Sequence, residues 1–133
     1  MAENIRRQRG FTLIELMVVV SLIVILATLG LAQYRSSIVR AQEAVLREDL
    51  FRMRDAIDQF YADKNEYPDS LESLVSDGYL RSIPEDPMTR SATTWQTVEA
   101  EPSLDDPFGA LGVYDVKSGS EGVALDGTNY ADW

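Results

Sequence analysis

The stretch Arg9-Gly10-Phe11-Thr12-Leu13-Ile14-Glu15 stands directly before a long run of apolar residues. From Phe11 to Gln33, Glu15 is the one charged side chain. At 1.5 Å per residue, a helix of this length extends roughly 30 Å, which is enough to cross the hydrocarbon core of a bilayer. An ionised acid inside a membrane costs about 2.5 to 3.5 kcal/mol even on the gentler insertion scales, so Glu15 needs a compensating partner.

The composition excludes several kinds of site and partner. The 133-residue chain has a net charge of -10, so nucleic acid is not an expected partner. It contains no Cys and no His, which excludes disulfides, thiol nucleophiles, His-dependent triads and zinc sites built from thiolates or imidazoles. Any metal must be bound by oxygen ligands, which favours calcium or magnesium.

The segment around Gly10 resembles the N-terminal signal of type IV pilins and of type II secretion pseudopilins. In these families prepilin peptidase cuts after the glycine, so the resemblance implies a leader at residues 1–10 and an N-methylated Phe11 as the mature terminus. It implies that the new ammonium group of Phe11 pairs with Glu15 of a neighbouring subunit, which neutralises both charges only when subunits pack together. Gly10 and Phe11 are thus the predicted processing residues, and Phe11 and Glu15 the predicted assembly residues.

An ordinary secretory signal peptide also fits a basic leader, an apolar run and the small-x-small sequence Gly30-Leu31-Ala32. Two features favour one long helix instead: Glu15 interrupts the start of the apolar run, and helical periodicity continues beyond Ala32 to about Asp63. The known pilins carry a proline where this chain has Ala32, which leaves open a kink near Gly30 or Ser36-Ser37. The predicted core residues on the continuing stripe are Leu46, Leu50, Met53, Ile57 and Phe60.

The remaining sequence predicts a small α+β domain. The residue before Pro68 is biased away from helix, so the long helix ends near Lys64, and Asp69-Ser70-Leu71-Glu72 resembles a capping box that opens a second, short helix. Alternating residues predict three short strands, at 93–99, 112–116 and 123–125. We therefore expect a pilin-like α+β fold with the following parts: a membrane-spanning and filament-core helix at 11–34 and a soluble domain at 35–133, in which amphipathic helix 35–63 and short helix 70–77 pack against a small antiparallel sheet at 93–133.

Within these families the chain is similar to the major pseudopilins, protein G, of type II secretion systems. The shared features are Tyr67-Pro68 after the long helix, then Gly78-Tyr79-Leu80, then Ile83-Pro84-Glu85-Asp86-Pro87. The family commonly continues with Trp-Gly, whereas this chain has Met88-Thr89.

The protein G family binds calcium in its C-terminal loop, and Ser118-Gly119-Ser120-Glu121-Gly122 looks like the segment concerned. The resemblance implies calcium as a cofactor, with these predicted ligands: Glu121, Asp126, Asp115, Ser118 and Asp132. A small domain without cysteines also commonly needs a metal to stabilise it. Spacing alone favours the plainer interpretation, because Asp, Asn, Ser and Gly are turn formers and acidic tails are usually solvated.

The resemblance implies a structural subunit and not an enzyme. We expect a single-pass protein of the bacterial inner membrane whose C-terminal domain lies in the periplasm. Prepilin peptidase, the secretion assembly platform and minor pseudopilins are its implied partners, and its implied product is a homo-oligomeric helical pseudopilus, periplasmic or extracellular, that drives protein secretion. The alternative is a type IV pilus pilin for adhesion, motility or DNA uptake. A secreted enzyme using Asp105-Asp106 as acid and base is disfavoured, since the sequence has no nucleophile motif and too small a core to shape a pocket.

Overall fold

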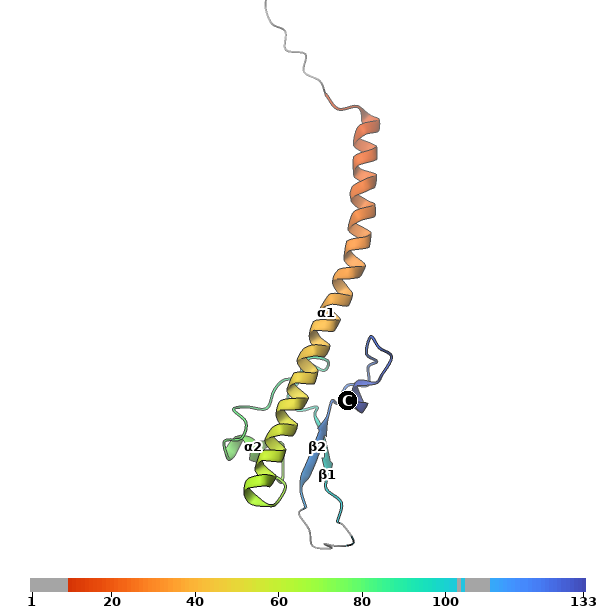
Figure 1. Ribbon diagram of the computed structural model, residues 1–133. Helices are drawn as coiled ribbons and strands as arrows, with labels where there is room; N and C mark the ends of the chain where they lie inside the picture. The colour runs from red at the N-terminus through yellow and green to blue at the C-terminus, as the bar shows by residue number, and fades with distance from the viewer. Residues whose placement is uncertain (1–9, 103, 105–110) are drawn as a thin grey trace, which may run out of the picture. The chain divides into compact units, whose positions relative to one another are not determined.

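The computed structural model describes residues 10–102, 104 and 111–133. The chain divides into two compact units, Met1–Ile38 and Val39–Trp133. The long helix α1 (Leu13–Lys64) extends through both units (Figure 1). The second unit also contains helix α2 (Leu71–Ser76), strands β1 (Gln96–Glu99) and β2 (Val113–Lys117), and the 3-10 helix η1 (Tyr130–Asp132). The predicted α+β class and the long N-terminal helix are confirmed.

In the first unit, α1 carries exposed apolar side chains on all of its faces. Leu13 is 76% exposed, Leu22 55% and Leu31 54%. Among the described residues, α1 is the helix whose length and composition suit a membrane crossing. The helix continues without interruption through Gly30 and Ser36-Ser37. Ala32 therefore keeps the backbone hydrogen bond that a proline would remove.

In the second unit, α1 buries one face. All five predicted core residues, from Leu46 to Phe60, are at most 5% exposed, which confirms the periodicity argument. They join one apolar cluster with α2, β2 and the C-terminal segment, to which the other elements contribute Leu71, Leu74, Trp95, Val113, Val116, Ala124 and Tyr130. Burying a large apolar side chain stabilises a fold by about 1.5 to 3 kcal/mol, so this stripe is the main stabilising feature of the unit.

The ends of both helices have specific caps. Asn65 ends α1 in the left-handed region, with φ 58°, and its amide donates to the Tyr61 carbonyl at 2.8 Å. At the start of α2, Ser70 is the N-cap and its hydroxyl accepts from the Ser73 amide at 3.4 Å. The expected capping box of Asp69 and Glu72 is therefore wrong by one position, because Ser70 is the residue that directly precedes the first helical residue.

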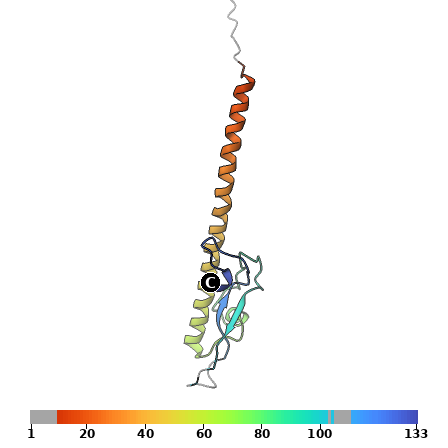
Figure 2. The ribbon, with the colours of Figure 1, turned by 90° about the vertical axis from the view of Figure 1, so that its right-hand side faces the viewer.

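Strands β1 and β2 form a two-stranded antiparallel sheet, in which Gln96 pairs with Lys117 and Val98 with Asp115. The register shifts between Val98 and Glu99, as in a β-bulge. Strand β2 directs Val113 and Val116 into the core, whereas all four residues of β1 are exposed. Figure 2 shows the two strands side by side.

The third predicted strand, at 123–125, does not form. Val123 makes only an isolated bridge with Asn129, and the chain turns sharply between them, with Gly127 at φ 87°. The amide of Leu125 donates to the carboxylate of Glu43 instead of to a neighbouring strand. The alternation of Val123, Ala124 and Leu125 was misleading because side-chain acceptors and a tight turn take up the backbone groups that a strand needs.

Gly119 is packed too closely for any side chain. A Cβ at this position would lie 1.9 Å from the carbonyl oxygen of Thr94. We predict that Gly119→Ala lowers the free energy of unfolding by about 1 to 3 kcal/mol, the usual cost of overpacking, measured by thermal denaturation of the chain in detergent. Gly78→Asn is the control, because Gly78 has φ 82° with open space around it and asparagine tolerates that conformation. Equal melting temperatures for the two variants would contradict the prediction.

Candidate functional site

The predicted processing site lies just outside the helix. Gly10 and Phe11 precede the first helical residue, Leu13, and the Phe11 side chain is 89% exposed. A non-helical, exposed peptide bond is the kind that a protease can bind. The basic part of the leader, at residues 1–9, lies outside the described residues, as does the Asp105-Asp106 pair.

Glu15 has partners within its own chain. The amide of Thr12 donates to Glu15 Oε2 at 3.0 Å and the Thr12 hydroxyl donates to the same oxygen at 3.2 Å. The Glu15 amide donates back to the Thr12 hydroxyl at 3.2 Å. This reciprocal arrangement is a capping box, and the Thr-x-x-Glu signal for it is present in the sequence. Thr12 is therefore a residue that the sequence analysis missed.

The capping box does not neutralise Glu15. Both donors on Thr12 are uncharged, so the capping box supplies no positive charge. Its neighbours are apolar and exposed: Phe11 by 89%, Leu13 by 76% and Leu16 by 56%. The exposed apolar side chains are unfavourable in water, whereas an ionised carboxylate is unfavourable in lipid, so this surface is suitable for contact with a positively charged and otherwise apolar partner.

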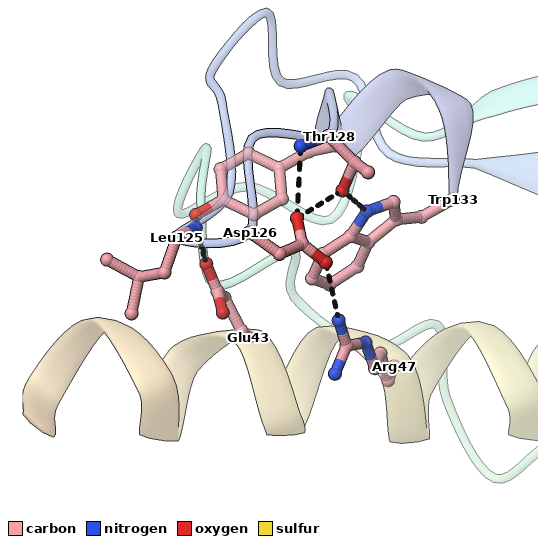
Figure 3. A network of polar contacts seen from close by, with 7 residues as sticks. Glu43, Arg47, Leu125, Asp126, Thr128 and Trp133 are labelled. Atoms are coloured by element: carbon pink, nitrogen blue, oxygen red, sulfur yellow. Dashed lines mark hydrogen bonds and ion pairs between the residues drawn. The ribbon is translucent and has the colours of Figure 1, made fainter.

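A second set of polar residues connects α1 to the C-terminal segment, and we call it the C-terminal network (Figure 3). Glu43, only 7% exposed, accepts hydrogen bonds from the Leu125 amide at 2.8 Å and from the Tyr130 hydroxyl at 3.0 Å. Burial raises the pKa of Tyr130, and its hydrogen bond to Glu43 raises that pKa further. The hydroxyl therefore stays protonated and continues to donate to the carboxylate.

Asp126 lies at the centre of the other half of this network. Its Oδ1 accepts from the Thr128 hydroxyl at 2.6 Å and from the Thr128 amide at 3.0 Å, while its Oδ2 lies 3.7 Å from Arg47. The Thr128 hydroxyl also accepts from the indole of Trp133 at 2.7 Å. The Thr128 side-chain and backbone hydrogen bonds, with Arg47, lower the pKa of Asp126. Figure 3 shows Arg47 and Glu43 directed from α1 toward this loop.

The structure does not bring the five predicted calcium ligands into one set. Asp115 accepts from Arg54 at 2.7 Å, Asp126 belongs to the network above, and Asp132 accepts from the Asn129 amide group at 3.1 Å. Glu121 is exposed. Within the described ranges no three acidic side chains come close enough to share a metal ion. This arrangement does not fit the six to eight converging oxygens that calcium requires, and calcium binding stays a prediction from the sequence.

Ser118, the fifth predicted ligand, is fully buried and bonded to another residue. Its hydroxyl donates to Asp86 Oδ2 at 2.6 Å, and Asp86 Oδ1 accepts from the Met88 amide at 2.8 Å. Asp86 is also fully buried, so the pair joins the proline-rich connector to the end of β2. The sequence analysis used Asp86 only as part of a motif, although an Asp that accepts from the amide two residues later is a common turn signal.

Comparison with known proteins gives a consistent set of relatives. The family described as "Prokaryotic N-terminal methylation motif" matches residues 5–31. The chain is 38% identical over 98 residues to type II secretion system core protein G of Pseudomonas aeruginosa, which covers 62% of this chain and 69% of the relative. It is 33% identical over 97 residues to the protein of the same name from Pectobacterium carotovorum subsp. carotovorum, which covers 61% of this chain and 62% of the relative.

A pilus protein is also similar to this chain. The type IV major fimbrial protein FimA of Dichelobacter nodosus is 44% identical over 73 residues, which is 55% of this chain and 47% of the relative. No solved structure matches the chain.

The buried acceptor Glu43 provides a test of the C-terminal network. We predict that Glu43→Ala lowers the free energy of unfolding by about 1 to 3 kcal/mol, because it leaves the Leu125 amide and the Tyr130 hydroxyl without an acceptor. Glu43→Gln retains a side-chain carbonyl and should cost less. Thermal denaturation gives the stability, and hydrogen exchange at the Leu125 amide gives the local effect. Unchanged exchange at Leu125 in Glu43→Ala would show that the bond is not made in solution.

The lowered pKa of Asp126 predicts a pH dependence. Folding lowers the pKa of the Asp126 carboxyl group from its ordinary value of 3.8. The ionised carboxylate therefore stabilises the folded state above that pH, and this contribution is lost as the pH falls through the pKa of the folded state. We expect the Asp126 carboxyl carbon to titrate below 3.8 by NMR. Thr128→Val should raise this midpoint more than Arg47→Gln does, since the hydroxyl is the larger cause. An unchanged midpoint in Thr128→Val would refute this assignment.

Proposed function

The chain belongs to the family of type II secretion system core protein G, and from this membership we propose that it is processed and polymerised into a type II secretion pseudopilus. The protein is a subunit of pilin or pseudopilin type. The observation that carries the proposal is the combination of the methylation motif at residues 5–31 with the first part of α1, whose apolar side chains are exposed on every face. Such a helix needs lipid or copies of itself as its surroundings.

We place the subunit first in the bacterial inner membrane. The apolar first part of α1 and the similarity to protein G fit a membrane-anchored protein. In the proposed orientation, the basic residues of the leader stay in the cytoplasm and the domain that follows α1 lies in the periplasm, as the positive-inside tendency favours.

Processing would create a positively charged group with which Glu15 can pair. Prepilin peptidase would cut between Gly10 and Phe11, and methylation of the new terminus would leave a cationic amine at Phe11. In a single subunit, Glu15 is held by the uncharged donors of Thr12. In the filament, the amine of a neighbouring subunit would add an ion pair in an environment of low dielectric constant, where an unpaired charge is costly. Subunits would therefore associate in the one axial register that brings the two groups together.

The proposed partners follow from this function. The subunit would contact copies of itself, prepilin peptidase, the secretion assembly platform and minor pseudopilins. The alternative function is a type IV pilus pilin for adhesion, motility or DNA uptake, and the similarity to FimA over 73 residues favours it. Loss of protein secretion after deletion of the gene would support the pseudopilus, whereas loss of surface pili with secretion intact would support the pilin.

Glu15 has two separable roles, as a cap and as a charge, and two variants distinguish them. Glu15→Ala removes both roles, whereas Glu15→Gln keeps an oxygen that Thr12 can bond but removes the charge. We predict that neither variant forms filaments in cells that produce the complete secretion system, while both are inserted into the membrane and cleaved. Electron microscopy and cross-linking measure assembly, membrane fractionation measures insertion, and mass spectrometry of the N-terminus measures cleavage.

Each measurement has an outcome that contradicts the proposal. Normal filaments from Glu15→Gln would show that Glu15 acts only as a helix cap. In the unaltered chain, a mature N-terminus at Leu31 or Gln33 in place of methylated Phe11 would indicate a cleaved secretory signal peptide and exclude the pseudopilus.

A further inference from the structure

The C-terminal segment from Ser118 to Trp133 is held with little regular structure of its own. Over these residues the structure has one isolated bridge and the short helix η1. Only Ser118, Ala124 and Tyr130 are buried. The chain contains no cysteine that could form a disulfide. A segment of this kind needs strong cross-links to stay on the domain, because few apolar contacts offset its conformational entropy.

Arg54 of α1 supplies such a cross-link. Its Nε donates to Asp115 Oδ1 at 2.7 Å, and one terminal nitrogen donates to the Val116 carbonyl at 2.9 Å and to the Trp133 carbonyl at 2.5 Å. The guanidinium thereby joins β2 to the end of the chain. These partners are 61 to 79 residues away in the sequence, so Arg54 closes long loops.

The acceptors around Arg54 are the kind that a calcium ion would use. They are one carboxylate and two backbone carbonyls, all hard oxygen ligands drawn from two separate segments. A cation among these oxygens offsets their mutual repulsion. The guanidinium meets this need with a planar fork of donors, and its charge would repel a metal ion placed beside it.

Packing fixes the position of Arg54. It neighbours Met53 and lies three residues before Ile57, and both of these side chains are fully buried in the core. The Arg54 side chain is itself 37% exposed and its partner Asp115 25%, so the pair is more shielded than the other arginine pairs of the domain. The Arg47 pair with Asp126 is 60% and 54% exposed, and exposed pairs contribute little to stability.

We propose that the Arg54 guanidinium is the resident cation of the C-terminal segment, in place of the calcium ion expected from the sequence, so that this segment folds independently of calcium. The readout is folding and not filament assembly, so this proposal and the proposed function can fail separately.

The test uses the full chain in detergent micelles. Thermal denaturation and limited proteolysis of the C-terminal segment are followed with calcium chloride, with magnesium chloride at the same concentration, and with a chelator. We expect the same melting temperature and the same proteolysis rate in all three conditions. Arg54→Met should lower the melting temperature by roughly 5 to 10 °C and expose the segment to protease.

Two further variants keep the test decisive if Arg54→Met fails to fold. Arg54→Lys retains the positive charge without the planar fork of donors. Its melting temperature should lie between those of Arg54→Met and the unaltered chain. Arg52→Met is the matched control, because this arginine lies on the same helix and pairs with Glu48 at 2.8 Å. The two side chains are 64% and 56% exposed, so the loss of this pair should change the melting temperature little. A melting temperature raised by calcium but not by magnesium would overturn the proposal, as would equal effects of Arg54→Met and Arg52→Met.

Discussion

The apolar stripe of α1 between Leu46 and Phe60 supports every other element of the second unit. A two-stranded sheet is at best marginally stable alone in water. A six-residue helix such as α2 is too short to be stable in isolation. Both are stable here because they bury side chains against the same helical face. The sheet and the C-terminal segment therefore depend on the helical form of α1 for the surface on which they pack.

Three polar residues of the second unit make their contacts at the edges of this stripe. Glu43, Arg47 and Arg54 lie on α1 beside the buried residues, and each reaches the C-terminal segment through hydrogen bonds or ion pairs. Apolar burial gives the unit most of its stability, whereas these directional contacts determine where the last residues lie. In the first unit the division is different, because Thr12 fixes the geometry of Glu15 with uncharged donors.

The sequence predicted those features that depend on local pattern. Helical periodicity identified α1 and five of its core residues, and proline and serine placed the end of α1 and the start of α2 to within about one residue. The N-terminal methylation motif was also recognised, and the matching family covers residues 5–31. These features could be predicted because the physical cause lies within a few residues of the effect.

The sequence did not predict contacts between distant residues. Arg47 and Arg54 were not recognised as partners of the C-terminal segment, since helical periodicity separates apolar from polar residues but does not identify which polar residues lie at the edge of a core. Asp115 and Asp126 were treated as metal ligands because their arginine partners, on α1, are far away in the sequence. Strand 123–125 was expected because alternation does not reveal that a buried carboxylate, Glu43, accepts the Leu125 amide.

The irregular register of strand β1 makes it a poor template for pairing with another copy of the chain. Strand β1 is exposed along its whole length, and a straight exposed strand invites pairing with the same strand of another molecule. The shift between Val98 and Glu99 interrupts the regular pairing there, and Glu99 places a charge on the strand. Two copies of the chain are thus discouraged from pairing through their sheets.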